Sequence, residues 1–231
     1  MAKELWQYFF NKPKKHYNKY MFEMEKYPDY IIYDEEQIDN NKGKWSEFFK
    51  NNNDIYLEIG CGSGNFTVKN AEKFTDRNFI GLELRLKRLV MSAKKSEKRD
   101  LKNIIFLRKR GEKLLEFLSD GEITGIYVNF PDPWEGEEDK RLVNLELFEK
   151  LDSCLLIGGK FFFKTDHLDY YRYVLDLLKK LENYKLVFNT DNLYSTEKKD
   201  DNIQTEFEQM FISKHKMNIK YIELEKIRNK F

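Results

Sequence analysis

Downstream of residue 50, short apolar runs alternate with segments whose apolar residues recur every three or four positions. Apolar runs bounded by turn residues predict strands, here over 54–59, 78–84, 103–107, 125–130, 159–166 and 184–189. Helical spacing predicts helices over roughly 65–75, 85–99, 112–119, 141–155 and 168–182. Strands that alternate with helices in this way form parallel sheets covered on both faces. The pattern therefore predicts an α/β, Rossmann-like fold with helices on both faces of one sheet.

The two ends of the chain depart from this alternation. Residues 1–50 are rich in lysine, asparagine and aromatic residues without a clear strand pattern, and we expect an arm with short helices that belongs to the same unit. Residues 51–231 are expected to form one domain. Strand character returns over 205–213 and 218–224 with no long helix between them, which predicts an antiparallel strand pair at the end of the sheet.

Charge and cysteine content narrow the class of protein only slightly. The chain has 41 Lys and Arg against 40 Asp and Glu, so its net charge of +1 indicates no partner by itself. Its two cysteines and three histidines lack metal-ligand spacing, so we expect no metal site. Neither a signal peptide nor a membrane-spanning run is visible, and a cytoplasmic location is the expectation.

The first predicted strand runs into LEIGCGSGNF, a turn with Gly60, Gly62 and Gly64. Glycines allow a tight turn and a close approach of backbone to ligand, and an acid at the end of the next strand, here Glu83, can bind ribose hydroxyls. The GxGxG spacing differs from the GxGxxG of NAD-binding proteins, and Glu58 suits a cationic ligand. These features favour S-adenosylmethionine; a strand–helix turn without ligand is the alternative.

The fourth of these strands ends in NFPDPW, where a small turn residue would be usual. Pro131 and Pro133 fix backbone φ and stiffen the segment around Asp132. Ligands of open parallel sheets bind beyond the carboxyl ends of the strands, where Trp134 offers a flat face for a base. We interpret the segment as a wall of the active site; a simple Pro-Asp turn with a packed tryptophan is the alternative.

Five motifs occur in order along the chain: EIGCGSGNF, GLELRLKRL, FPDPW, FKTDH and TEFEQMF. This series resembles that of the tRNA (guanine-N7-)-methyltransferase family over most of residues 50–215. FPDPW and T-x-[FY]-E are specific to that family, whereas the glycine motif is shared by many methyltransferases. The resemblance implies a class I methyltransferase fold, S-adenosylmethionine as the methyl donor, and guanosine 46 in the variable loop of tRNA as the substrate.

The resemblance also implies roles for individual residues. Cofactor-binding positions are Glu58, Gly60, Glu83 and Asp132, with Gly62 and Gly64 added by the glycine turn and Glu112 as the candidate acid near the adenine. Asp132 is also the candidate catalytic residue. Substrate-binding candidates are Asp166, Thr205, Glu206, Phe207 and Glu208, with Trp134 as a stacking surface. Asp166 and Glu208 are expected to accept hydrogen bonds from the guanine N1–H and exocyclic amine.

The chain departs from the family pattern after the tryptophan. Relatives carry a proline and a basic run there, whereas this chain has EGEEDKRLVN, which puts the local mode of RNA contact in doubt. An arginine common after T-x-[FY]-E is replaced by Gln209-Met210.

Two other stretches are strongly basic. Residues 85–110 hold eleven Lys and Arg against two acids, and residues 3–19 hold five lysines among aromatic residues. Both stretches are candidates for phosphate contact, and a solvated helix face is the alternative for each.

Three functions remain in consideration. A tRNA (guanine-N7-)-methyltransferase, monomeric or homodimeric, fits the most motifs. A methyltransferase with a substrate other than tRNA is the alternative suggested by the acidic loop. A non-catalytic RNA-binding module would need a decayed cofactor site, which the intact glycine turn and acids argue against.

Overall fold

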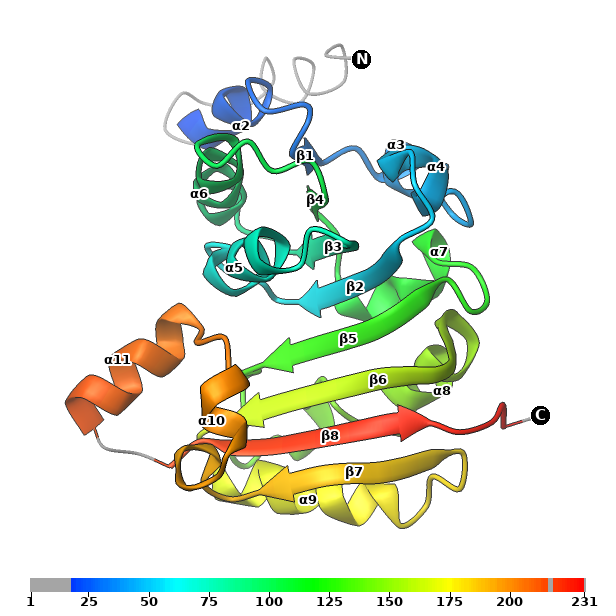
Figure 1. Cartoon of the computed structure of the whole chain (residues 1–231), viewed down its shortest axis with the longest axis vertical. Coiled ribbons are helices and arrows are strands. Elements are labelled where there is room, and N and C mark those ends of the chain that lie inside the picture. Colours follow the sequence, from blue (N-terminus) through cyan, green and yellow to red (C-terminus); the bar gives the residue numbers. More distant parts are fainter. Residues whose placement is uncertain (1–17, 216–217, 231) are drawn as a thin grey trace.

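In residues 18–215 and 218–230, which the computed structural model describes, eight strands form one sheet (Figure 1). The strands are β1 (Ile31–Ile32), β2 (Asp54–Ile59), β3 (Arg77–Leu82), β4 (Ile104–Leu107), β5 (Ile123–Asn129), β6 (Leu155–Thr165), β7 (Tyr184–Thr190) and β8 (Lys220–Lys226). They lie in the order β1-β4-β3-β2-β5-β6-β8-β7. Strands β1 to β6 pair in parallel, and β8 runs antiparallel between β6 and β7. The predicted α/β class with an antiparallel C-terminal end is confirmed.

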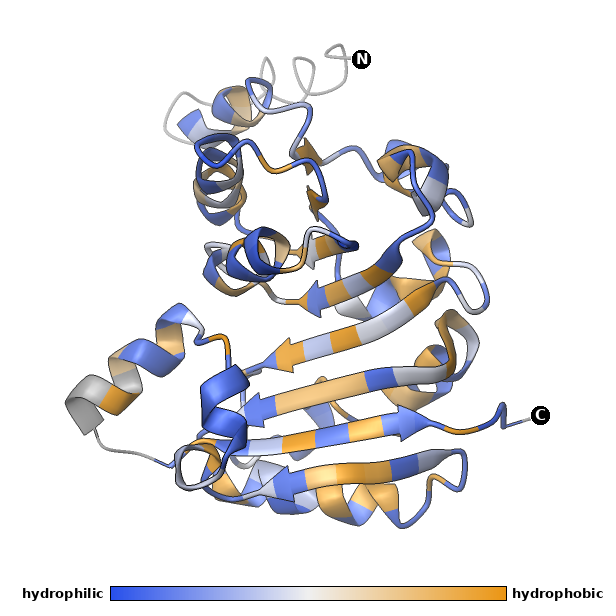
Figure 2. Ribbon diagram, in the orientation of Figure 1, coloured by the Kyte–Doolittle hydropathy of each residue, from blue (hydrophilic) through white to orange (hydrophobic). Residues whose placement is uncertain are grey.

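Helices cover both faces of this sheet. They are α2 (Lys19–Met24), α3 (Glu35–Asp39), α4 (Trp45–Phe49), α5 (Asn65–Lys73), α6 (Leu86–Glu97), α7 (Leu114–Phe117), α8 (Leu145–Cys154), α9 (Leu168–Leu178), α10 (Lys198–Asp201) and α11 (Glu206–His215). Helix α5 packs on β3 in front of the sheet, while α8 and α9 pack on β6 behind it (Figure 1). Apolar bands follow the strands, whereas α10 is hydrophilic (Figure 2). Burial of β3 and β4 on both faces explains their continuous apolar runs, whereas Leu186 and Val187 of β7 are exposed.

The segment before residue 50 contains a strand that the sequence pattern did not reveal. Ile31 and Ile32 pair in parallel with Phe106 and Leu107 of β4. Two residues are too few to show a periodicity, so only the tertiary pairing identifies them as a strand. The same segment also contributes Trp45, which is fully buried and donates a 2.9 Å hydrogen bond from Nε1 to a main-chain carbonyl.

The strand predicted over 205–213 is wrong, because residues 206–215 form helix α11. The Glu208 backbone N–H donates to Thr205 Oγ1 at 3.0 Å, and the Thr205 backbone N–H donates to a Glu208 carboxylate oxygen at 3.2 Å. This reciprocal pair is a capping box, whose signature is S/T-x-x-E. The signal was therefore present in the sequence as TEFE. The antiparallel partners of β8 are β6 and β7 instead.

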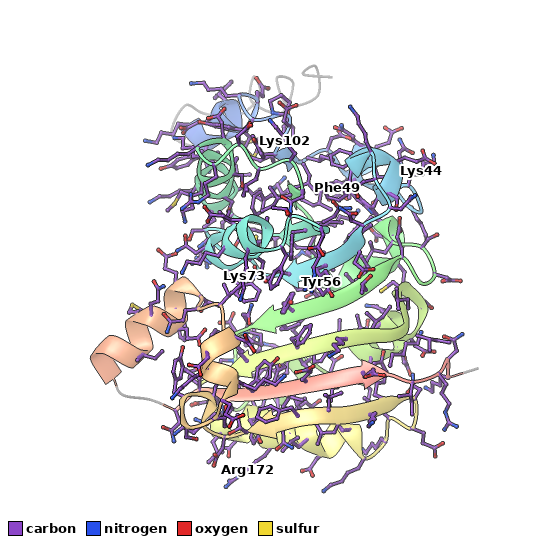
Figure 3. All side chains as sticks on the ribbon, viewed as in Figure 1. Lys44, Phe49, Tyr56, Lys73, Lys102 and Arg172 are labelled. Atoms are coloured by element: carbon purple, nitrogen blue, oxygen red, sulfur yellow. The ribbon has the colours of Figure 1, made fainter. Side chains whose placement is uncertain are left out.

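The strand order creates a switch point between β2 and β5. The chain passes from β2 outward to β3 and β4, and then crosses back to β5 on the other side of β2. Tyr56 of β2, labelled in Figure 3, stacks on Phe79 and Tyr127 with ring centroids 5.8 and 6.0 Å away, which ties β2 to both neighbours. The arrowheads of β2, β5 and β6 point to the edge where α10 and α11 lie (Figure 1). Ligands of such sheets bind at this edge beside the switch point.

Candidate active site

The glycine turn lies between β2 and α5 at this edge. Gly60, Gly62 and Gly64 have φ values of 75°, 58° and 74°, a left-handed region that favours glycine. A Cβ on Gly60 would meet no atom within 4 Å, so the backbone there faces open space. A Cβ on Gly64 would lie 2.5 Å from Ser92 Oγ, so that glycine serves the packing of α5 against α6. The turn thus offers exposed backbone at Gly60 and a closely packed base at Gly64.

Glu58 at the end of β2 is a buried acid beside this turn, with 3% of its surface exposed. Its carboxylate accepts hydrogen bonds from Thr67 Oγ1 and, at 2.9 Å, from Asn129 Nδ2. Burial raises the pKa of Glu58, while these hydrogen bonds and the charge of Lys164 lower it in part. A buried carboxylate with raised pKa is stabilised by a cationic ligand, and the ammonium group of S-adenosylmethionine has this charge.

Glu83 follows the end of β3 and lies on another side of the same cavity. One of its carboxylate oxygens accepts from the backbone N–H groups of Leu84 and Arg85, each at 2.8 Å. Its other oxygen is 3.5 Å from a guanidinium nitrogen of Arg88. The carboxylate is therefore held in one orientation, which suits the two hydroxyl groups of a ribose.

The corner after β5 has an unusual backbone. Phe130 and Trp134 have φ values of 52° and 47°, which are uncommon for residues other than glycine. Such conformations persist where surrounding structure holds them, often at functional sites. Here the Phe130 backbone N–H donates to the Lys164 carbonyl at 2.8 Å, and Arg141 Nε donates to the Pro133 carbonyl at 2.8 Å. Asp132, between these two anchors, is exposed and lines the cavity.

Three of the four acids in the loop after Trp134 have partners within the chain. Glu135 lies 2.8 Å from His167 Nε2, and Glu137 forms an ion pair with Lys140. Glu138 lies 3.9 Å from Arg141. Three acids of this loop are therefore held by side chains of the same chain.

One cavity of about 870 Å³ joins these elements. Most of the predicted site residues line it: Glu58, Gly60, Gly62, Glu83, Glu112, Asp132, Trp134, Thr205, Glu206 and Phe207. Three predicted residues do not: Gly64 lies at the packed base of the turn, and Asp166 and Glu208 lie away from the lining. Glu208 is fully buried.

Helix α11 contributes its first turn to the cavity. Glu206 accepts a hydrogen bond from Ser63 in the glycine turn, and Ser63 Oγ is 3.2 Å from Lys95 Nζ. The Phe207 ring lies 4.9 Å from that of Phe130. The T-x-[FY]-E segment thus contacts both the glycine turn and the FPDPW corner.

The basic stretch 85–110 divides into two groups. Arg85, Arg88 and Arg110 are exposed at the cavity. Lys109 is 2% exposed and lies 2.7 Å from Asp39; burial opposes its charged form, but hydrogen bonds to carboxylates outweigh this and raise its pKa. Lys94 and Lys95 on α6 bind Glu23 and the glycine turn. The basic residues predicted over 3–17 lie outside the described residues.

Two residues near the cavity, Lys164 and Arg141, were not predicted as site residues from the sequence. Each is a buried cation, 4% exposed, that binds main-chain carbonyl groups. The signal for Lys164 was a lysine inside the apolar run FFFKT, where a charge needs an internal partner.

In the described residues, no group of three acids, histidines and cysteines is placed to hold a metal ion, and no helix is long and apolar enough to span a membrane.

An open α/β sheet with a glycine turn, a buried acid and an oriented carboxylate at its switch point is typical of the S-adenosylmethionine-dependent methyltransferase class. The family described as "Putative methyltransferase" matches residues 52–221. The chain belongs to the tRNA (guanine-N7-)-methyltransferase family of these enzymes, and S-adenosylmethionine is its methyl donor.

Individual relatives agree with this assignment. A tRNA (guanine-N(7)-)-methyltransferase of Clostridium novyi is 34% identical over 75% of this chain and 81% of its own length. A bifunctional glycosyltransferase/methyltransferase of Fusobacterium nucleatum is 51% identical over 98% of this chain, which spans only 35% of that relative. A solved antibiotic-related methyltransferase shares the fold, with a TM-score of 0.61, 17% identity, and coverage of 80% of this chain and 94% of its own.

Proposed function

We propose that the chain transfers a methyl group from S-adenosylmethionine to N7 of a guanosine in tRNA, at position 46 of the variable loop. One observation carries this proposal: a single cavity joins the cofactor turn to both family-specific motifs, FPDPW and TEFE. Bacterial relatives that are 31–36% identical are tRNA (guanine-N(7)-)-methyltransferases. A tRNA substrate implies a cytoplasmic reaction, and we treat residues 1–50 as an arm of the 51–231 domain.

The proposed roles of the site residues follow from their positions. Gly60 and Gly62 present backbone to the cofactor, Glu58 faces its ammonium group, and Glu83 accepts from its ribose hydroxyls. The bound cofactor supplies an electrophilic methyl group. Glu112, exposed at the cavity rim beyond β4, is the candidate for the adenine.

Methylation of guanine N7 requires mainly that the protein align the base with the methyl group. N7 carries a lone pair and no proton, so no general base is needed to activate it. Holding the base in line with the methyl group supplies much of the rate. Trp134 and Phe207 both line the cavity and offer rings for stacking. The Asp132 carboxylate stabilises the positive charge that develops on the methylated base.

Acids as well as exposed cations line the cavity, and the exposed cations suit a polyanionic substrate. Arg85, Arg88 and Arg110 line it as exposed cations, while Glu137 and Glu138 of the 135–139 loop form ion pairs with Lys140 and Arg141. The acidic loop is therefore a weaker argument for a substrate other than tRNA.

Methylation of bulk tRNA with radiolabelled S-adenosylmethionine tests the proposal, with cleavage at 7-methylguanosine to locate the base. We expect incorporation at position 46, and none into a transcript that carries adenosine there. Replacement of Arg85, Lys87 and Arg110 by serine should make the affinity for tRNA less dependent on salt concentration. A complex with fewer phosphate contacts releases fewer counterions when it forms. Cofactor binding without transfer to any tRNA would contradict the proposed substrate.

A further inference from the structure

The Glu208 carboxylate is enclosed by the chain's own donors. It is 0% exposed, and one oxygen accepts from Tyr194 Oη and Asn202 Nδ2, each at 2.6 Å. Its other oxygen lies 3.1 Å from Lys164 Nζ and 3.2 Å from the Thr205 backbone nitrogen. A guanine could hydrogen-bond to this carboxylate only by displacing these partners.

Lys164 is the buried counter-charge of this carboxylate. It extends from β6, and its ammonium group also binds the side chain of Asn202 and, at 3.1 Å, the carbonyl of Ile203. Burial lowers the pKa of Lys164, and the neighbouring Glu208 opposes this shift. Removing one member of a buried pair leaves an uncompensated charge, whereas replacing both members removes that penalty.

The main chain of Lys164 holds the FPDPW corner while its side chain holds α11. Lys164 pairs with Asn129 in the register of β5 and β6, and its carbonyl accepts from the Phe130 backbone N–H at 2.8 Å. The Phe130 ring in turn contacts Phe207, the residue before Glu208. One residue of the central sheet therefore fixes the distance between the corner and the first turn of α11.

The residues of the TEFE segment have different roles in this geometry. Glu206 and Phe207 line the cavity, while Glu208 lies beneath them and is excluded from it. We propose that Lys164 and Glu208 are a pair of positioning residues that hold Glu206 and Phe207 against the methyl-transfer corner, and that Glu208 does not contact the guanine. This inference rests on the proposed function for its kinetic consequences but not for the docking of α11 itself.

A double-mutant comparison separates positioning from substrate contact. The variants are Glu208→Gln, Lys164→Met and the two combined, with Lys160→Met as the control because Lys160 lies on the same strand and pairs with Glu223, a different carboxylate. Each single variant should lower kcat roughly 10- to 100-fold, the effect of misplacing a reacting group by about 1 Å. The combined variant should be several-fold faster than either single variant, and the control should match wild type. A combined variant as slow as Glu208→Gln alone would overturn the proposal and restore Glu208 as a substrate contact.

Hydrogen exchange without tRNA gives a second readout that does not depend on methyl transfer. Amides of residues 203–210 should exchange faster in both single variants than in wild type, with protection partly restored in the combined variant. If a single variant does not fold, Tyr194→Phe carries the test, since it removes one donor to Glu208 and leaves both charges paired. Faster exchange over 203–210 with unchanged S-adenosylmethionine affinity supports the proposal, and unchanged exchange in Tyr194→Phe and in every other folded variant overturns it. If the variants show the expected changes in hydrogen exchange but the wild-type protein methylates no tRNA, the proposed function is refuted and the positioning role of Lys164 and Glu208 is not.

Discussion

Replacement of Arg141 by methionine should disturb the catalytic corner without removing any group that touches the cofactor. Arg141 follows Lys140 directly after the acidic loop, so a direct contact with RNA is the obvious role for this arginine. The structure places it instead under the corner, with 4% of its side chain exposed. Its Nε donates to the Pro133 carbonyl at 2.8 Å, and its guanidinium carbon lies 4.8 and 5.1 Å from the ring centroids of Tyr170 and Tyr173.

The size of the effect follows from these contacts. Loss of the charged donor leaves the Pro133 carbonyl without this partner, at a cost of about 1–3 kcal/mol. Each desolvated cation–π contact adds about 0.5–2 kcal/mol, and burial of the methionine side chain offsets part of the loss. We therefore expect the free energy of unfolding to fall by about 2–4 kcal/mol, which lowers Tm by roughly 5–15 °C in a chain of this length.

Catalysis should fall together with stability. Asp132 lies between Pro131 and the carbonyl that Arg141 holds, so a displaced corner misplaces its carboxylate. We expect kcat to fall roughly 10- to 100-fold at 25 °C, where the variant is still folded. S-adenosylmethionine affinity should fall less than kcat, because the cofactor acids Glu58 and Glu83 lie at the ends of other strands and only Asp132 is displaced.

Thermal unfolding, calorimetry with S-adenosylmethionine and steady-state methylation of tRNA measure the three quantities. Lys140→Met is the matched control, since Lys140 is exposed and its loss should raise KM for tRNA with Tm nearly unchanged. A higher KM for tRNA with unchanged Tm and kcat in Arg141→Met would show that Arg141 contacts RNA and that the reasoning is wrong.

Three further substitutions test the cavity. Glu83→Ala should weaken S-adenosylmethionine binding by about 1–3 kcal/mol, because charge-assisted hydrogen bonds to the ribose are lost; unchanged affinity in calorimetry would reject this role. Asp132→Asn should slow methyl transfer roughly tenfold or more with little change in Tm, since one electrostatic contact is removed from an exposed loop; an equal loss of stability and rate would favour a structural corner. The pKa of Glu58 is raised in the folded state, so the folded protein binds this proton more tightly than the unfolded chain, and stability falls as pH rises through the interval between the two pKa values. Glu58→Gln should therefore raise Tm at pH 7 and remove part of that pH dependence while weakening cofactor binding; a lower Tm at pH 7 would contradict this.

The local pattern of the chain determined most of the fold and the family. Apolar runs and helical spacing marked β2 to β7 and their connecting helices. The signal was clearest for β3 and β4, because strands buried on both faces must be apolar throughout. The glycine turn and FPDPW were readable because their constraints are local: left-handed φ at Gly60 and proline rings at 131 and 133. Parallel topology then required the ends of β2, β3 and β5 to meet, so Glu58, Glu83 and Asp132 could be assigned to one site in advance.

Tertiary structure alone decided the partners of the charged side chains. The acidic loop suggested a substrate other than tRNA, yet three of its carboxylates have Lys140, Arg141 and His167 as partners. Glu208 appeared to face the substrate, yet it is buried against Lys164, 44 positions away in the sequence. An ion pair between distant residues leaves no periodic trace, since its energy depends on burial and on the approach of two elements rather than on neighbours along the chain. The structure thus determines which acids of this chain face a ligand and which hold the site in place.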